Sequence, residues 1–392
     1  MARNIEVEGG VSSIKITPKK PVYLAGFDRK STGHELSRGI HDDLYAKCLL
    51  IKVGGRQLGF LALDLIGLFH DDVEKFRRLS CKCGLNPDGV IVSSTHQHSG
   101  PDTLGLWGPE PTVSGVDPEY MSFLMDRMVT ALAEASGRPR PVRLWASKTE
   151  MPKGVAKNSR DPGVLDEEIV ILRVEEVGGS NMAVLVNFGL HPEVLWADND
   201  LITSDFPHYM YRTVESEVGG LCIFINGSLG GMVTPLVKER SFKEAERVGS
   251  TIGDAILESL DDAEPIEAVR FKLLTERVKL PIRNEKFRTL SDLGVLKREL
   301  VDGDVETRLT IATLGNASFL TIPGEPLPKF GLRVKSMMPG EFRFLIALGD
   351  DELGYIIPHE DWSPERYEES MSLGPETAPI LIDGIKRMIS KI

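Results

Sequence analysis

Short apolar runs rich in β-branched residues alternate along this chain with longer segments in which apolar residues recur every three or four positions. The first pattern is typical of buried strands and the second of helices that bury one face, so together they predict an α/β fold. The chain has 392 residues, enough for a large core, and no repeat or linker-like stretch divides it. We therefore expect a single domain over residues 1–392, with a mixed β-sheet core flanked by helices.

The turn residues between two pairs of these runs indicate hairpins. Gly54 and Gly55 separate one pair, and Gly315 and Asn316 another, so part of the sheet is expected to be antiparallel. Strands are expected at residues 46–53, 57–65, 89–95, 167–175, 182–188, 221–227, 307–314, 317–322 and 342–348. Helices are expected at residues 71–81, 118–135, 205–216, 243–260 and 378–391.

Charge and hydropathy exclude several classes of partner. The net charge is −12 and no Lys/Arg cluster offers a basic surface, so neither nucleic acid nor an anionic membrane is expected to bind. The longest apolar run, GFLALDLIGLF, is interrupted by Asp64 and is far shorter than the roughly 20 residues that span a bilayer. The N-terminal stretch MARNIEVEGGVSS carries acids where a signal peptide has a basic start, which favours a cytoplasmic location.

The four cysteines are Cys48, Cys81, Cys83 and Cys222. Cys81 and Cys83 form one Cys-x-Cys pair, but no second pair at zinc-finger spacing accompanies it. We expect free thiols in a reducing compartment, and a metal or redox role for this pair is the alternative.

The stretch VIVSSTHQHSGPD places His96 and His98 where an apolar strand runs into a Ser/Gly/Pro turn. If the strand continues through them, both side chains point to the same side, because side chains alternate along a strand. Strand ends are also where open α/β sheets place their binding sites. The two residues are either structural histidines satisfied by backbone carbonyls or two imidazoles that converge on one ligand.

Three further polar residues follow apolar runs. They are His191 in VLVNFGLHPEVL, Glu325 in ASFLTIPGEP and Tyr355 in FRFLIALGDDELGYIIP. Taken singly, each also suits a structural histidine, a capping glutamate or a core tyrosine. Together with the first histidine, two imidazoles, a carboxylate and a phenol would suit one zinc ion that keeps a position open for water.

These residues lie in stretches that resemble, in the same order, the signature stretches of the neutral ceramidase family. The stretches are STHQHSGPD, NFGLHPEVLW with LITSDFPHYM, TIPGEP, GYIIPHEDWSPERYEES, GIHDDLYAKCLLI, LALDLIGL and NSRDPG, between about Gly10 and Tyr367. The resemblance implies the fold of that family's catalytic domain and a zinc-dependent amidase. We expect no counterpart of the family's C-terminal immunoglobulin-like domain, because the sequence stops soon after Tyr355.

The resemblance also implies roles for individual residues. The zinc ligands would be His96, His191, Glu325 and Tyr355. His98 and Arg160 would lie beside the substrate carbonyl. A zinc-bound water, whose pKa the metal lowers to roughly 7, would attack that carbonyl. His98, with Tyr355, would stabilise the oxyanion, and His98 or a carboxylate would return the proton to the leaving amine.

One stretch departs from the family. The family's Gly-Asp-Val-Ser-Pro reads GMVTP here, so Met232 replaces the acid and Thr234 replaces the serine while keeping a hydroxyl. Thr234 is therefore a candidate catalytic residue, although a metal-bound water already supplies a nucleophile. Asp42, Asp43 and Asp64 are candidates for orienting the ligand histidines or for holding a second ion.

Two other functions compete with an amidase that cleaves an N-acyl bond. One is a zinc-dependent esterase, lactonase or sugar-modifying hydrolase, and the other is a non-catalytic zinc protein with a closed ligand shell. The missing export signal, the lost acid and the acidic stretch HEDWSPERYEES predict a smaller or more polar substrate than ceramide, and a polar pocket mouth. A deep apolar pocket would instead indicate acyl chains.

Overall fold

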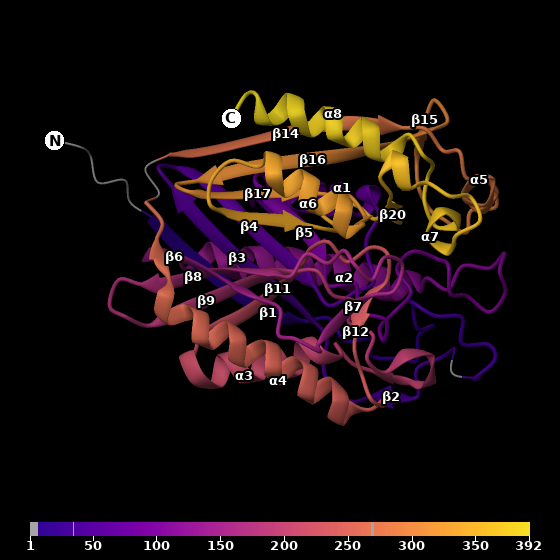
Figure 1. Cartoon of the computed structure of the whole chain (residues 1–392), viewed down its shortest axis with the longest axis horizontal. Helices are drawn as coiled ribbons and strands as arrows, with labels where there is room; N and C mark the ends of the chain where they lie inside the picture. Colours follow the sequence, from indigo (N-terminus) through magenta and orange to yellow (C-terminus); the bar gives the residue numbers. More distant parts are fainter. Residues whose placement is uncertain (1–6, 34, 268–269) are drawn as a thin grey trace.

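The computed structural model describes residues 7–33, 35–267 and 270–392, so residues 1–6, part of the stretch considered for export, lie outside it. The described residues form two stacked β-sheets with helices on their outer faces (Figure 1). The expected α/β class with a mixed sheet core is confirmed. The single-domain organisation over residues 1–392 stays a prediction.

The larger sheet has nine strands within the described part of the chain. In spatial order they are β11 (Leu221–Asn226), β9 (Asn181–Phe188), β8 (Glu168–Glu176), β6 (Arg140–Glu150), β1 (Val7–Lys15), β3 (Tyr45–Val53), β4 (Arg56–Leu63) and β5 (Val90–Ser94), with β13 (Glu264–Pro265) beside β6. The turn at Gly54 and Gly55 joins β3 and β4 as an antiparallel hairpin, as expected. The sheet is mixed because β5 runs parallel to β4, and β11 parallel to β9.

The smaller sheet has five strands, counted over the same described residues. They are β14 (Phe271–Leu280), β16 (Asp304–Leu314), β17 (Ala317–Thr321) and β19 (Phe342–Ile346), with β15 (Leu300–Val301) beside β16. The turn at Gly315 and Asn316 joins the antiparallel strands β16 and β17, again as expected. Strand β19 runs parallel to β17.

An apolar core fills the space between the two sheets. Phe60 of β4 lies 5.1 Å from Phe319 of β17, measured between ring centroids, and Phe319 stacks on Phe344 of β19 at 4.6 Å. Burying a side chain of this size contributes roughly 1.5–3 kcal/mol, so these contacts hold the sheets together. The ends of their strands therefore keep a fixed relation to one another.

Helices cover both outer faces (Figure 1). On the larger sheet lie α1 (His70–Lys82), α2 (Pro118–Gly137), α3 (Phe206–Val218) and α4 (Phe242–Ser259). On the smaller sheet lie α6 (Pro328–Met337) and α8 (Thr377–Ile389). Each buries an apolar face, and side-chain caps at Asp117 and Ser241 satisfy backbone N–H groups at the starts of α2 and α4.

The remaining elements are short. They are β2 (Gly39–Ile40), β7 (Ala156–Asn158), β10 (Leu201–Ile202), β12 (Val233–Pro235), β18 (Glu325–Pro326), β20 (Tyr355–Ile356), α5 (Glu285–Asp292), α7 (Tyr367–Ser370) and the 3-10 turns Trp196–Asp198, Leu260–Asp262 and His359–Asp361. Every strand and helix expected from the sequence is present, with ends shifted by a few residues. The four cysteines are free thiols. None of the helices in the described ranges combines the length and hydrophobicity needed to cross a bilayer.

Candidate metal centre

Two histidines from the larger sheet and a glutamate from the smaller one meet at the edge where their strands end. His96 follows β5, His191 follows β9, and Glu325 begins β18 just after β17. His96 Nε2 lies 3.3 Å from Glu325 Oε2, and His191 Nε2 lies 3.1 Å from the same oxygen. All three side chains are buried. The structure thus brings together three of the four residues expected to bind zinc.

The backbone fixes the orientation of both imidazole rings. His96 Nδ1 lies 2.6 Å from the carbonyl oxygen of Ile66, and His191 Nδ1 lies 3.0 Å from that of Val233. A carbonyl oxygen only accepts hydrogen bonds, so Nδ1 of each ring donates and Nε2 can keep its lone pair. Metal-bound histidines usually have this arrangement, so the residues fit a zinc ion held by Nε2 atoms and a carboxylate.

The charges of this group favour a bound cation. Burial disfavours the ionised form of Glu325, but His96 and His191 outweigh it and lower the pKa of the Glu325 carboxyl. Burial likewise disfavours the protonated form of His96. The nearby Glu325 carboxylate outweighs this effect and raises the pKa of the imidazole. Glu325 is therefore ionised at neutral pH, as a metal ligand must be.

His98 lies beside this group, with its ring centroid 5.0 Å from that of His96 and 5.5 Å from that of His191. The strand does not continue through both residues, because β5 ends at Ser94, close to its expected end, and His96 has a φ of 64° that turns the chain. The rings still converge, and nitrogens of the three histidines lie within 4.8 Å of one another. Burial, with His96 and His191 adding to it, lowers the pKa of His98 well below its usual value, so this imidazole is neutral.

Two buried glutamates that the sequence analysis did not single out flank the centre. Glu193 Oε2 lies 3.3 Å from His98 Nδ1. Glu352 has an oxygen within 4.8 Å of ligand atoms of both His96 and Glu325. Burial raises the pKa of both carboxyls, and the Glu325 charge adds to the effect at Glu352, whose pKa lies well above its usual range. The centre is therefore richer in carboxyl groups than the sequence indicated.

Tyr355 pairs with Glu325 in the parallel strands β20 and β18, which places it at the centre. Its hydroxyl donates to Met232 Sδ at 3.3 Å, so the methionine that replaces the family's acid contacts this phenol. Thr234 is buried in β12, and its hydroxyl acts on the ionisation of Glu193. Tyr355 thus borders the centre, and Thr234 lies close to Glu193.

Arg160 is held by acidic residues near the C-terminal end of the chain. Its guanidinium donates to Glu368 at 2.9 Å and to Glu369 at 2.7 Å, and also to the Asp361 carbonyl. It lines a surface hollow beside Lys329. Arg160 therefore braces the segment around α7, and its place beside the substrate carbonyl stays a prediction.

The three aspartates proposed to orient the ligand histidines are engaged elsewhere, which corrects that expectation. Asp42 accepts hydrogen bonds from Thr203 and Ser204, Asp43 pairs with Lys15, and Asp64 accepts from the Tyr45 backbone and the Tyr211 hydroxyl. Backbone carbonyl oxygens, and not these aspartates, orient the two ligand histidines.

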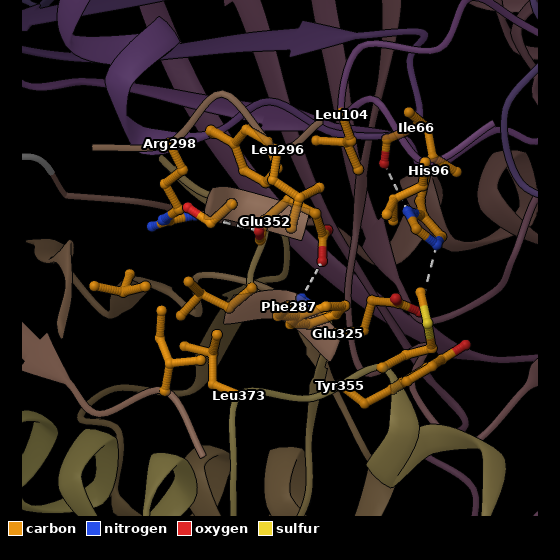
Figure 2. A pocket seen from close by; sticks show the side chains of 18 of the residues that line it. Ile66, His96, Leu104, Phe287, Leu296, Arg298, Glu325, Glu352, Tyr355 and Leu373 are labelled. Carbon is orange, nitrogen blue, oxygen red and sulfur yellow. Dashed lines mark hydrogen bonds and ion pairs between the residues drawn. The ribbon is translucent and has the colours of Figure 1, made fainter. Parts of the chain in front are cut away.

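An apolar cavity opens beside the centre (Figure 2), with about 830 Å³ of empty space including its opening to solvent. His96, Glu325 and Tyr355 line its polar end. Its walls are mainly aliphatic and aromatic, and include Ile66, Leu104, Phe287, Leu296 and Leu373. Of the acidic stretch 359–370, Tyr367 alone reaches the lining, so the acids of this stretch do not line the cavity. A polar pocket mouth stays a prediction.

Solved structures share this architecture. Neutral ceramidase from Pseudomonas aeruginosa superposes with a TM-score of 0.83 at 18% identity, covering 99% of this chain and 75% of that one. The chain has the neutral ceramidase fold. A structure described as ceramidase complexed with C2 gives a TM-score of 0.81 at 16% identity, covering 98% and 74% of the two chains. The resemblance of the sequence stretches to this family is thereby confirmed.

Sequence comparison adds a shorter match. Neutral ceramidase A from Dictyostelium discoideum is 25% identical over 149 residues, which is 34% of this chain and 21% of that protein. The matched part thus spans about a fifth of the curated relative. No family model matches the chain. In this ceramidase-like fold, His96, His191, Glu325 and Tyr355 all lie at one edge of the stacked sheets.

Proposed function

We propose that this ceramidase-like chain is a zinc-dependent hydrolase that cleaves an N-acyl amide bond. One observation carries the proposal: His96 Nε2 and His191 Nε2 converge on Glu325 Oε2, and His96 and Glu325 line an apolar cavity. The likeness to neutral ceramidases supports the choice of an amide. Zinc bound there would polarise the scissile carbonyl and lower the pKa of water to roughly 7.

His98 is the residue best placed to move protons. Glu193 Oε2 lies 3.3 Å from its Nδ1, so this carboxylate would favour the tautomer of the neutral ring that carries its proton on Nδ1. Nε2 is then free to take a proton from the attacking water and to deliver it to the leaving amine. The Tyr355 hydroxyl borders the cavity and is the candidate donor to the oxyanion.

The cavity indicates the substrate class. Its apolar walls suit an acyl chain, since each methylene removed from water contributes about 0.8 kcal/mol. A long-chain amide therefore replaces the smaller or more polar substrate expected from the sequence. The Tyr355 hydroxyl is hydrogen-bonded to Met232 Sδ, so it is not free to bind zinc as a fourth protein ligand. A non-catalytic zinc site with a closed ligand shell is therefore not favoured.

The test combines metal analysis with a substrate series. The purified protein is stripped of metal, reloaded with Zn²⁺ and assayed on amides and esters that share the same acyl chains from acetyl to palmitoyl. We expect one zinc per chain, activity that requires it, and amide turnover that rises with chain length. Absence of bound zinc would overturn the metal assignment, and a preference for esters or for acetyl groups would overturn the substrate assignment.

A further inference from the structure

Arg29 is a buried cation, and no carboxylate of the described residues balances its charge. The residue is only 2% exposed. Burial lowers the pKa of its guanidinium to about 10, which leaves the group charged at neutral pH. Burying a charge without a counterion is costly unless hydrogen bonds satisfy the charged group. The hydrogen bonds of Arg29 therefore indicate what it does.

The guanidinium joins two segments that are far apart in the sequence. Nη1 donates to the carbonyl oxygens of Leu24 at 3.1 Å and Ala25 at 2.7 Å, and Nη2 donates to the carbonyl oxygen of His98. A planar guanidinium offers five N–H groups in a fixed arrangement and can serve acceptors in two directions, whereas a lysine ammonium is a point charge. Arg29 thus fastens the 24–29 segment to the backbone of His98, 69 residues later in the chain.

The 24–29 segment also contacts the imidazole ring of His98. Gly26 has a φ of 93°, and a Cβ added there would come within 2.3 Å of His98 Cγ, so a larger residue would push the ring away. Phe27 packs on the same ring at an interplanar angle of 72°, with 4.8 Å between the centroids. Neither ring nitrogen of His98 forms a hydrogen bond with a described residue. Contacts with this segment, and not hydrogen bonds of its own, therefore hold the ring in place.

We propose that Arg29 is a positioning residue: by clamping the 24–29 segment to His98, it keeps Nε2 of that imidazole where it can pass a proton to the leaving amine. The inference rests on the proposed function, in which His98 moves protons. A proton passes only across about 2.6–3.2 Å between heavy atoms, and a misplacement of about 1 Å can cost roughly 100-fold in rate. Arg29 does not line the cavity, so it acts through His98.

The test compares two variants of Arg29 with a buried control. Arg29→Met removes every donor and keeps an unbranched side chain, and Arg29→Lys keeps the charge without the planar fork. Lys47→Met is the control. Lys47 is 4% exposed, and its ammonium donates to the Cys222 carbonyl oxygen at 2.8 Å, but it lies on β3 and does not line the cavity. The control therefore removes a buried cation bonded to the backbone without touching His98.

Each zinc-loaded protein is assayed at pH 8.5 on an alkyl amide and on a p-nitrophenyl ester of the same acyl chain. An alkyl amine must be protonated to leave, whereas p-nitrophenolate leaves as an anion. Water on zinc has already lost its proton at this pH, since its pKa is roughly 7, so the ester requires no proton transfer by His98. We expect Arg29→Met to lower kcat for the amide by about 100-fold, to lower kcat for the ester much less, and to keep the KM and zinc content of the wild type.

The other two variants complete the comparison. Arg29→Lys should show a smaller loss on the amide, and it carries the same comparison if Arg29→Met does not fold. Lys47→Met should change amide and ester turnover in the same proportion. The ratio of the two turnover numbers cancels any general loss of active protein, so a role of Arg29 in stability alone would leave the ratio unchanged.

The outcomes separate this inference from the proposed function. A wild-type chain without zinc-dependent amide turnover contradicts the proposed function, and with it the reaction that His98 would serve. If the wild type is active, an unchanged ratio in the Arg29 variants, or the same change of ratio in Lys47→Met, overturns only the role of Arg29. Crystals of Arg29→Lys give a second measurement, independent of activity. A His98 Nε2 displaced by about 1 Å or more, with His96 and His191 in place, supports the inference, and an undisplaced ring overturns it.

Discussion

His98 and His96 are close in space but differ in their contacts. His96 donates to the Ile66 carbonyl and points Nε2 at Glu325, whereas neither ring nitrogen of His98 forms a hydrogen bond with a described residue. We expect His98→Ala to keep its zinc and to lose activity by about 100-fold to 1,000-fold, and His96→Ala to lose both. Metal analysis beside a steady-state assay checks this. Equal loss of zinc in the two variants would make His98 a ligand.

Asp64 should make stability depend on pH. Burial raises the pKa of its carboxyl to about 6, from about 3.9 in an unfolded chain. Between these values the folded state holds a proton that the unfolded state releases, so stability falls as pH rises from 4 to 6. Above pH 6 the buried charge of Asp64 lowers the free energy of unfolding by its full amount, at most about 3 kcal/mol. Below pH 4 Asp64 is protonated in both states, so this effect vanishes.

The measurement is urea unfolding of the wild type and of Asp64→Asn at pH 4 and pH 7.5. The wild type should lose more stability across this interval than the variant, which has no charge at this position. The same pH dependence in both proteins would show that Asp64 ionises normally. Each variant is compared only with itself across pH, so the altered hydrogen bonds to Tyr45 and Tyr211 do not enter the difference.

Sequence reasoning found the histidines of the centre but not two of its glutamates. The chain has 8 histidines against 58 acidic residues, so a histidine at a strand end stands out and a glutamate does not. Glu352 in DDELG has the pattern of an exposed acidic turn. In the fold its side chain lies against Gly67, which is far away in the sequence, so its burial depends on contacts that the local sequence does not show.

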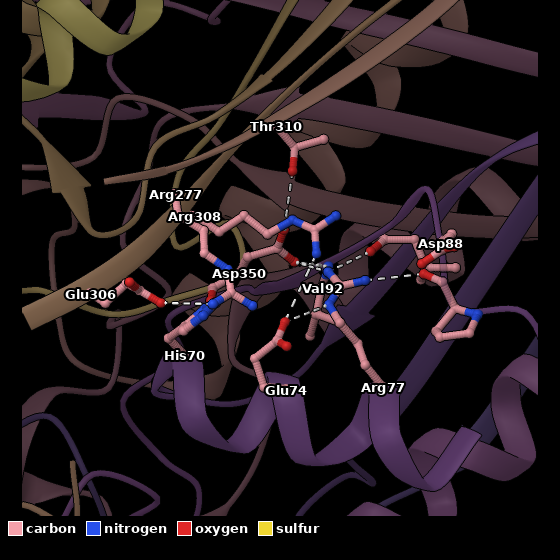
Figure 3. A network of polar contacts seen from close by, with 12 residues as sticks. His70, Glu74, Arg77, Asp88, Val92, Arg277, Glu306, Arg308, Thr310 and Asp350 are labelled. Carbon is pink, nitrogen blue, oxygen red and sulfur yellow. Dashed lines mark hydrogen bonds and ion pairs between the residues drawn. The ribbon is translucent and has the colours of Figure 1, made fainter. Parts of the chain in front are cut away.

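The segment that carries Glu352 and Tyr355 is anchored by a buried ionic network (Figure 3). Asp350 accepts hydrogen bonds from Arg77 of α1 at 2.9 Å and from the Val92 backbone of β5 at 3.0 Å. Thr310 of β16 donates to the second oxygen at 3.3 Å. One carboxylate thus ties a helix and both sheets to the segment.

We expect Asp350→Ala to lower the free energy of unfolding by about 3–5 kcal/mol, because it removes the fully buried partner of the Arg77 guanidinium and leaves only the less buried Glu74. Asp302→Ala is the matched control. Asp302 also has a positive φ, 57° against 64° for Asp350, but its side chain is 85% exposed and pairs with Lys279 on the surface. Urea unfolding should show a change of about 1 kcal/mol or less for the control. Equal effects would mean that backbone strain, and not the network, decides stability.

Hydrophobic periodicity predicted the strands and helices with the most apolar sequences, but it missed three long strands. β14, with the sequence FKLLTERVKL, alternates exposed charged residues with partly buried apolar ones, and β1 and β6 also mix polar and apolar positions. Such segments are stabilised by their neighbours in the sheet more than by their own hydropathy. Their pairing is therefore a property of the assembled sheets.

At the scale of the whole molecule, the cavity should select substrates by acyl length. Leu300 and Val301 are adjacent in β15, but Leu300 lines the cavity and Val301 is 36% exposed. We expect Leu300→Trp to lower kcat/KM for long acyl chains and to spare acetyl substrates. If the indole excludes about three methylenes, the loss of roughly 2.4 kcal/mol corresponds to roughly 50-fold.

Val301→Trp places the same side chain on the surface and should leave the chain-length profile unchanged. The readout is the ratio of kcat/KM for palmitoyl and acetyl amides, which cancels any general loss of active protein. An unchanged ratio in Leu300→Trp would mean that the acyl chain binds elsewhere.

The stacking of two sheets was not predicted, although the α/β class and the mixed pairing were. Residues that face the other sheet and residues that face a helix are equally apolar, as the neighbours Phe319 and Leu320 of β17 illustrate from opposite faces of the smaller sheet. Hydropathy indicates that a face is buried, but it does not indicate whether a helix or another sheet covers that face. The division of the strands into two sheets was therefore not visible in the sequence.

The ligands of the centre come from both sheets, since His191 follows a strand of the larger one and Glu325, 134 residues later, follows a strand of the smaller one. An ion held between them would act as a cross-link that stabilises the native chain in proportion to the logarithm of free zinc. Removing zinc should therefore speed amide hydrogen exchange at the turn between β17 and β18, and expose that turn to proteases. In a zinc-poor environment the chain would lose abundance as well as activity.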